Sequence, residues 1–216
     1  MRRFDRFVNA LACAPVSERA CNQYSRLDGD LRGNAIRRRN LRLYLAELAA
    51  IGSDLLLVGE AVSYRGGLLT GIAFVSETVM LGGGDIASPP HHILGAAHGY
   101  RKATTGPRLS TEASATMVWQ TIRSIDPLPL LWNAFPFHPF HAGRPESNRI
   151  PSSSELETGG HFIDMLVRMF SIGRVVAVGN QADVSLARRG IPHEKLRHPS
   201  MGGKQRFADG MARLSQ

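Results

Sequence analysis

Apolar residues along this chain occur in two patterns, short continuous runs and longer segments with helical spacing. The runs Asp54–Gly59, Pro129–Asn133 and Arg174–Asn180 are continuous and end at Gly or Asn. Such runs are typical of strands that are buried on both faces of a parallel sheet. A shorter run at Lys195–Arg197 predicts a fourth strand directly before His198.

Segments with helical spacing lie before, between and after these runs. They predict helices over about Phe4–Ala14, Asn34–Ile51, Thr111–Arg123, Glu155–Phe170, Gln181–Arg189 and Gly203–Leu214. The alternation predicts an α/β fold with three layers, α/β/α, around a central, mostly parallel four-stranded sheet. We expect one domain over residues 1–216, with an N-terminal helical extension at 1–33 and a long inserted loop at 82–110.

Polar residues follow the predicted strands. Glu60, Asn133, Asn180 and His198 each stand at or just after the end of a run. In open parallel sheets, ligands bind beyond the carboxyl ends of the strands. These four residues are therefore expected to lie near one rim of the sheet.

The composition narrows the choice of partner. The chain carries 26 Lys and Arg against 18 Asp and Glu, a net charge of +8, and its pI is about 10.3. This excess favours a polyanionic partner, nucleic acid before an anionic membrane surface. A basic surface that is merely solvated is the equal alternative.

The sequence does not favour a membrane protein, a secreted protein or a protein with a thiolate-bound metal centre. No stretch approaches the ~18 consecutive apolar residues of a membrane-spanning helix, and the first residues lack the apolar segment of a signal peptide. Cys13 and Cys21 are the only cysteines, too few for a four-thiolate iron–sulfur or zinc site. We therefore expect a cytoplasmic protein that uses no metal or cofactor.

Two segments could hold a planar ligand. Gly59–Gly66 with the later Phe74 combines a Gly-rich turn with an aromatic ring that could stack on a base. Core packing of Phe74 is the alternative. Asn133 offers an amide that can read an imide edge, with a plain turn or cap role as the alternative.

Two further segments could hold phosphate. Arg144–Glu155 reads as a loop that enters a helix through a capping box from Ser152 to Glu155. Arginine and helix N-termini both bind phosphate, although capping alone needs none. In His198–Lys204, the His can donate to a developing anion, and the Ser hydroxyl and the following amides can hold phosphate.

In this order, the four segments resemble the motifs of the uracil-DNA glycosylase superfamily. Gly59-Glu-Ala61 followed by Gly71–Val75 looks like the GEAPG and GxPFV of the family-four branch, and Leu130–Asn133 looks like its Asn-bearing strand. Arg144–Pro151 is similar to RPPxNRxP, and His198-Pro-Ser200 is similar to motif B. The resemblance implies the α/β fold of that superfamily.

The sequence also departs from the family-four pattern. Members of that branch carry four cysteines for an iron–sulfur cluster, whereas this chain has two cysteines in total. Val62-Ser63 replaces the Pro-Gly pair, and Ala61 stands where the best-studied branch has a water-activating Asp. Ser63 stands where that branch has a Tyr that excludes thymine, with Tyr64 beside it. We expect a separate branch without the cluster.

The resemblance implies roles in a reaction on a flipped-out base. His198 would donate to uracil O2, Asn133 would read O4 and N3–H, and Phe74 would stack on the ring. Glu60 is the nearest carboxylate for positioning the water, with backbone carbonyls as the alternative. The base pocket is further predicted to include Gly59, Ala61, Ser63 and Tyr64. The predicted DNA contacts are Arg149, Ser152, Ser200, Gly202, Gly203, Lys204 and, as a wedge in the vacated stack, Met201.

The implied function is that of a monofunctional uracil-DNA glycosylase acting in base excision repair. It would hydrolyse the N-glycosidic bond of uracil, with other deaminated bases as further candidates, in single- and double-stranded DNA and leave an abasic site. The alternatives are a uracil- or abasic-DNA binding protein with little turnover, an enzyme of free nucleosides, and a general single-strand binder. Ala61 motivates the first alternative, and the charge of +8 disfavours the second. The resemblance also implies a monomer.

Overall fold

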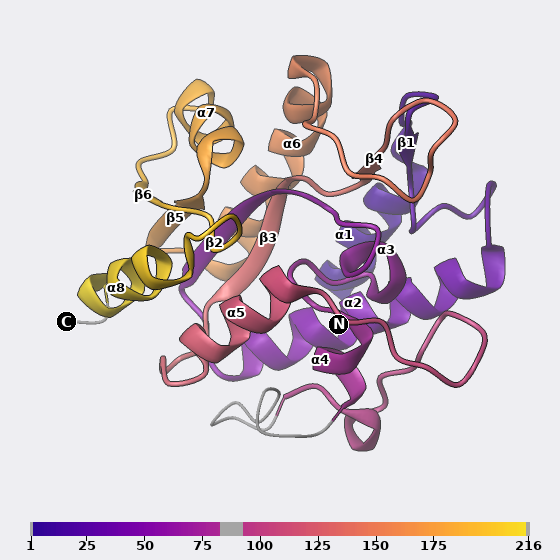
Figure 1. The fold of residues 1–216 in the computed structure, drawn as a ribbon, viewed down its shortest axis with the longest axis horizontal. Helices are drawn as coiled ribbons and strands as arrows, with labels where there is room; N and C mark the ends of the chain where they lie inside the picture. Colours follow the sequence, from indigo (N-terminus) through magenta and orange to yellow (C-terminus); the bar gives the residue numbers. More distant parts are fainter. Residues whose placement is uncertain (1, 83–92, 215–216) are drawn as a thin grey trace.

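The computed structural model describes residues 2–82 and 93–214 and contains a four-stranded parallel sheet at its centre (Figure 1). Its strands are β2 (Leu55–Ala61), β3 (Leu130–Phe135), β5 (Arg174–Val178) and β6 (Glu194–Leu196). Their spatial order is β3-β2-β5-β6, and each neighbouring pair is parallel. The predicted parallel sheet is confirmed.

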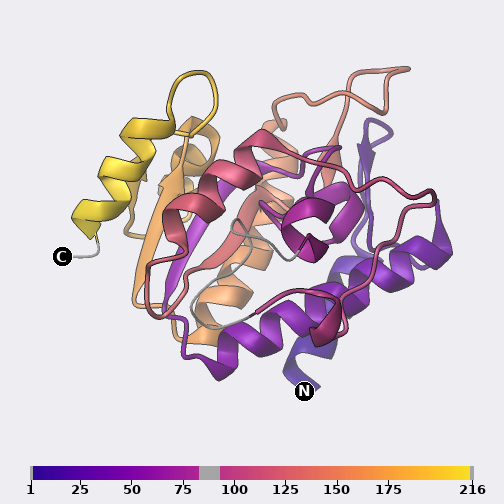
Figure 2. The same ribbon diagram turned by 60° about the horizontal axis from the view of Figure 1, so that its bottom comes forward.

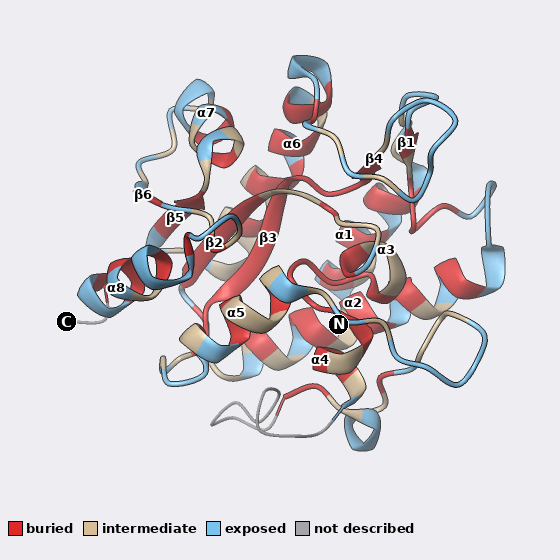
Figure 3. Ribbon diagram, viewed as in Figure 1, coloured by how far each residue is buried: buried red, intermediate tan, exposed pale blue. Residues whose placement is uncertain are grey.

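The continuous apolar runs form strands because both faces of the sheet are covered. Every residue of β3 is buried, as are Leu55–Val58 of β2 (Figure 3). The outer edge of β3 is closed by a side chain, since the Tyr44 hydroxyl accepts a 2.9 Å hydrogen bond from the Leu131 N–H. This bond satisfies a ladder donor that would otherwise face no strand.

Helices cover the two faces of the sheet (Figures 1 and 2). The chain crosses from β2 to β3 in one direction and from β3 through β5 to β6 in the other. Right-handed crossovers then place α5 on one face, with α8 beside it, and α6 and α7 on the opposite face. This confirms the three-layer α/β/α prediction. The long helices are α1 (Arg2–Cys13), α2 (Leu31–Ala50), α5 (Ala113–Ile122), α6 (Ser153–Phe170), α7 (Asn180–Arg188) and α8 (Lys204–Leu214).

Several short elements were not predicted because they lack a periodic pattern. They are two to five residues long, which is too short for apolar spacing to indicate either a helix or a strand. One is an antiparallel pair that joins residues far apart in the sequence, with Cys21 opposite His138. These elements are β1 (Ala20–Cys21), α3 (Gly67–Thr70), α4 (Glu77–Leu81), the 3₁₀ helix η1 (Ala96–His98) and β4 (His138–Pro139).

The N-terminal segment, predicted as an extension, packs into the core. The ring of Phe7 in α1 is fully buried, with its centroid 5.3 Å from that of Trp132 and 6.0 Å from that of Phe162. Helix α2 also begins earlier than the predicted Asn34, at Leu31, because Asp30 caps it by accepting from the Gly33 N–H. The segment 1–33 therefore includes part of the framework of the fold.

The predicted loop at 82–110 is described only in part, since residues 83–92 lie outside the described residues. The described part is held by the carboxylate of Glu47, which accepts from the Leu94 N–H and the Tyr100 hydroxyl and lies 3.0 Å from His98 Nδ1. Within residues 2–82 and 93–214, no helix is both long and apolar enough to cross a membrane.

The packing of α1 predicts a large cost for truncating Phe7. Phe7→Ala should lower the free energy of unfolding by about 3–5 kcal/mol, because it empties a fully buried site between two aromatic rings. Leu27→Ala is the control in the same N-terminal segment, since Leu27 is 85% exposed, and it should change stability by less than about 0.5 kcal/mol. Urea unfolding measures both. Equal, small effects would show that α1 is only an appendage.

Candidate functional site

A pocket of about 460 Å³ opens at the carboxyl ends of the parallel strands. Its lining includes Glu60 from β2, Asn133 from β3, Asn180 at the start of α7 and His198 after β6. These are the four residues that strand ends alone placed at one rim, and the structure brings them together. The pocket therefore follows from the sheet topology rather than from a local motif.

Gly59 lets an aromatic ring and an amide converge at this rim. The parallel register puts Gly59 opposite Asn133. A Cβ atom at Gly59 would overlap the Phe74 ring and would lie 2.7 Å from Asn133 Oδ1. Phe74 itself has a φ of 56°, a left-handed conformation that is rare for a bulky residue. Trp119 Nε1 holds it there by donating a 3.0 Å hydrogen bond to its carbonyl oxygen.

Asn133 carries the most informative polar group in the pocket. The residue is only 4% exposed. No described residue forms a hydrogen bond with its side-chain amide, although other buried asparagines such as Asn34 and Asn40 are well bonded. A side-chain amide that lines a pocket and forms no hydrogen bond with the described protein is free to bond to a polar ligand.

His198 presents a neutral imidazole. Its Nδ1 lies 3.2 Å from the Ser200 backbone N and 2.7 Å from Ser200 Oγ. Because a backbone N–H can only donate, Nδ1 must accept, and the ring proton is on Nε2. Burial, and then the charge of Arg197, lower the pKa of His198 below its usual value. No described residue takes the Nε2–H bond, which leaves a neutral donor beside the pocket.

The turn after His198 only partly matches the predicted phosphate contacts. The Gly203 N–H closes the turn by donating 3.0 Å to the Ser200 carbonyl, so the prediction that this amide grips phosphate is corrected. The Ser200 hydroxyl is likewise bonded to His198. Lys204 is exposed, and its Nζ donates to Gln120. Of the paired glycine amides, only that of Gly202 is kept as a proposed phosphate donor.

Two large apolar side chains stand exposed near the pocket. Met201, at the tip of the turn, is 90% exposed and has a φ of 52°. Ile150 is 61% exposed, and it lines the pocket from the opposite loop. An exposed apolar residue in a strained conformation is unusual, and such features cluster at ligand sites. Met201 was expected as a wedge, whereas nothing in the sequence singled out Ile150.

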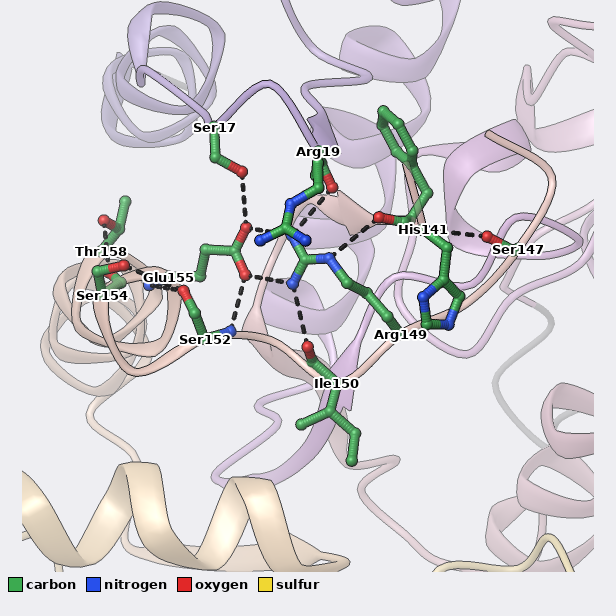
Figure 4. A network of polar contacts seen from close by, with 11 residues as sticks. Ser17, Arg19, His141, Ser147, Arg149, Ile150, Ser152, Ser154, Glu155 and Thr158 are labelled. Carbon is green, nitrogen blue, oxygen red and sulfur yellow. Dashed lines mark hydrogen bonds and ion pairs between the residues drawn. The ribbon is translucent and has the colours of Figure 1, made fainter. Parts of the chain in front are cut away.

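Arg149 has a structural role, which corrects its prediction as a phosphate contact. Its guanidinium donates to both oxygens of Glu155 and to the carbonyls of Arg19, Phe140 and Ile150 (Figure 4). These bonds use all five N–H donors of an arginine, so none is left for a phosphate.

Ser152 also acts inside the protein. Its hydroxyl accepts from the Glu155 N–H while the Glu155 carboxylate accepts from the Ser152 N–H, so the predicted capping box is confirmed. Burial by itself would raise the pKa of Glu155, but the hydrogen bonds from Arg149, Ser152 and Ser17 lower it to about 2. The same loop carries Ile150 into the pocket, so this clamp sets one wall of the site.

The predicted base-pocket residues divide into two groups. Ala61 and Ser63 line the pocket with small side chains. Tyr64 is not among the described lining residues, and its ring lies beneath the Arg65 guanidinium and 6.5 Å from the His138 ring. Tyr64 therefore does not supply a bulky side chain to the pocket.

Other lining residues were missed at the level of sequence. The most notable is Glu112, which lies far from every motif and directly precedes α5. Burial raises its pKa to about 7, and a hydrogen bond from Ser63 only partly opposes this. Nothing local in the sequence marks it, because only the folding of α5 over the sheet brings it to the rim. The missed lining residues include Glu112, Asn148, Ile150, Gln181 and Arg197.

Comparison with known proteins identifies the fold. No family model matches the chain, and no curated protein matches it. Among solved structures, the crystal structure of wild-type SMUG2 from Pedobacter heparinus matches with a TM-score of 0.61 and 15% sequence identity. The match covers 98% of this chain and 96% of that one. This chain therefore has the same α/β fold as that structure, which is the fold that the motifs implied.

The Arg149–Glu155 clamp predicts a defined acid sensitivity. Glu155→Gln should cost about 3 kcal/mol at pH 7, because it leaves the largely buried Arg149 without its counter-charge. A depressed carboxyl pKa stabilises the fold above about pH 4.5, and that stability is lost as the pH falls toward about 2. The variant should therefore lose less stability than the wild type as the pH falls from about 5 to about 2.5. Urea unfolding at a series of pH values measures this difference.

Glu157→Gln is the control for this prediction. Glu157 lies on the same helix and is paired with Arg189, but its side chain is 74% exposed. Exposed pairs contribute about 0–1 kcal/mol, so the control should keep both the stability and the acid profile of the wild type. A similar loss in both variants would mean that Glu155 does not hold this wall.

Proposed function

We propose that this protein is a DNA glycosylase that hydrolyses the N-glycosidic bond of uracil in DNA and leaves an abasic site. The observation that carries the proposal is the convergence of the unpartnered Asn133 amide, the neutral His198 and the Phe74 ring on one pocket. An amide can read the edge of a base, a ring face can stack on it, and a neutral hydrogen-bond donor can stabilise the negative charge that develops on it. The fold shared with SMUG2 supports the same class.

In this proposal the target base leaves the stack and enters the pocket. Its glycosidic carbon is inaccessible within a duplex, and flipping costs a few kcal/mol, less from single strands. Phe74 stacks on the ring, which contributes ~1–3 kcal/mol for such contacts. The Asn133 amide accepts from N3–H and donates to O4. Its lack of a protein partner means that these bonds need not displace existing ones.

His198 acts as the transition state develops. The C1′–N1 bond breaks with its electrons moving to the base, so the sugar becomes oxocarbenium-like and uracil becomes anionic. The Nε2–H of a neutral imidazole donates to O2 as charge accumulates there. The Ser200 N–H fixes this tautomer at Nδ1. One preorganised donor of this kind is worth roughly 2.7–4 kcal/mol.

Glu60 is proposed to position the attacking water. It lines the pocket at the end of β2, and burial raises the pKa of its carboxyl above the usual value. Ala61, which stands at the expected position of a water-activating Asp, also lines the pocket but has no functional group. Backbone carbonyls remain the alternative support for the water, since a dissociative reaction demands little of its nucleophile.

DNA binding is proposed to centre on the turn after His198. Met201 enters the vacated stack, and the Gly202 N–H and Lys204 contact phosphate. The net charge of +8 supports binding of single- and double-stranded DNA that weakens as salt rises. A monomeric state and a cytoplasmic location stay predictions.

A second candidate is a protein that binds uracil or abasic DNA with little turnover. The observation that favours it is the small, apolar Ala61 at the rim, where the better-known branch has its water-activating carboxylate. The two candidates differ in whether free uracil is released.

The test is base release from labelled oligonucleotides with one uracil, single- and double-stranded, followed by alkaline cleavage. We expect release by the wild type and a loss of at least ~10² in rate for His198→Ala, as for a lost anion-stabilising donor. The affinity for DNA should persist. His161→Ala, on an exposed face of α6, is the matched histidine control and should keep the wild-type rate.

The outcomes separate the candidates. A wild-type protein that shifts uracil or abasic DNA in a gel but releases no base would favour the binding protein. Equal release by His198→Ala and the wild type would remove His198 from the mechanism.

Base selectivity tests Asn133. Asn133→Asp changes one donor of the amide into an acceptor, so the variant should lose preference for uracil over cytosine, whose 4-position is a donor. The measurement is the ratio of release rates from uracil- and cytosine-containing strands. A ratio of single-turnover rates that stays at the wild-type value, in a variant that still folds, would show that Asn133 does not read the base.

A further inference from the structure

The pocket holds a carboxyl group that no motif explains. Glu112 reaches the rim from the N-cap position of α5, yet its side chain forms no capping hydrogen bond. Its carboxyl oxygen occupies the space beside Gly66, where a Cβ atom would overlap it. Ser63 forms a hydrogen bond with it. The carboxyl is therefore enclosed between the first motif and α5, at the wall of the pocket.

Outside the pocket, the enclosed glutamates of the described chain have clear structural partners, whereas the two pocket carboxyls, Glu60 and Glu112, have no cationic partner. Glu155 is paired with Arg149, Glu77 accepts from Thr104 and the Ser110 N–H, and Glu47 fixes the loop before Tyr100. Glu112 has no cationic partner among the described residues, although the chain carries 26 Lys and Arg. An enclosed carboxyl with a single hydroxyl partner is unfavourable for folding, which indicates a role in the site.

We propose that Glu112 is a second carboxylate of this site and accepts the proton of the water that attacks the sugar. This inference rests on the proposed glycosylase function and assigns it a further catalytic residue. Glu60 and Glu112 reach the pocket from different elements, so one carboxyl can hold the water while the other takes its proton. The Ala61 position then needs no acidic group.

The step balances without any further reactant. As the C1′–N1 bond breaks, its electron pair leaves with the base. A lone pair of the water oxygen forms the new bond to C1′, and one water proton passes to the Glu112 carboxylate. The products are the abasic sugar with a hydroxyl at C1′, the base anion held by His198, and protonated Glu112. Protonated Glu112 then releases its proton to solvent, and the base anion takes up one proton from solvent, which restores the carboxylate and gives a neutral base.

The charge state of Glu112 makes this role dependent on pH. Burial raises its pKa to about 7, so it is partly ionised near neutrality and loses the capacity to accept a proton as the pH falls. The charged and titratable side chains that share the pocket are Glu60, Arg149, Arg197 and His198. The pKa of His198 is lowered, so an acid limb belongs to one of the two carboxyls, Glu112 or Glu60, since burial raises the pKa of both. Removing Glu112 distinguishes them.

The first test is single-turnover release of uracil between pH 5.5 and 9. The wild-type rate should rise with pH through about 7, and Glu112→Gln should lower the rate at pH 8 by about 10² and remove that limb. Gly66→Ala, which displaces the carboxyl without removing it, should lower the rate in the same direction. Glu146→Gln, an exposed carboxyl of the loop before α6, is the control and should match the wild type. A wild-type rate and pH profile in Glu112→Gln would overturn the proposal.

A second measurement does not depend on turnover. An oligonucleotide with a cationic pyrrolidine abasic analogue mimics the charged sugar, and a tetrahydrofuran analogue is its neutral match. At pH 8, Glu112→Gln should weaken binding of the cationic analogue by about tenfold and leave the neutral one unchanged, because an ionised carboxylate near C1′ attracts the charge. Equal losses for both analogues would overturn the inference. If the wild type releases no base but Glu112→Gln still weakens binding of the cationic analogue only, the glycosylase function is rejected and the placement of the Glu112 carboxylate near C1′ is kept.

Discussion

The parallel pairing of β2 with β3 is the constraint on which the site depends. Its register places Gly59 opposite Asn133, and the missing side chain at Gly59 makes room for the Phe74 ring and the Asn133 amide together. A shift of one residue would turn Asn133 to the other face of the sheet. Phe74 adds to this arrangement, since the hydrogen bond from Trp119 holds it in a left-handed conformation. Stacking and hydrogen-bonding groups are thus fixed before a ligand enters, so binding does not have to order them.

Charged and polar side chains have two different roles in this structure: some hold the walls of the pocket, and others face its interior. Arg149 looked available for phosphate, yet its guanidinium is fully bonded to Glu155 and to three carbonyl groups. In contrast, the polar groups that face the pocket have few partners within the described chain. Asn133 has none, and Glu112 has only Ser63. This division is physically consistent, because groups that hold the walls must be satisfied, whereas groups that meet a ligand must be free to bond to it.

The proposed chemistry is distributed over separate elements of the fold. The neutral donor follows β6, the amide lies on β3, and the carboxyls come from β2 and the start of α5. The fold is shared with SMUG2 at 15% sequence identity. Positions around a common rim can be filled by different residues as long as the sheet keeps them together.

The sequence by itself determined the sheet strands, the long helices, the rim that joins Glu60, Asn133, Asn180 and His198, and the Ser152–Glu155 capping box. Each of these depends on apolar periodicity, on strand ends or on residues within one turn, which are local signals. Only the tertiary structure decided that Arg149 is a clamp, that the Gly203 amide closes a turn, and that Glu112 belongs to the pocket. Whether a polar group is free or satisfied depends on the partners that meet it. For Arg149 and Glu112 those partners lie mostly in other segments of the chain, so no spacing rule reveals them.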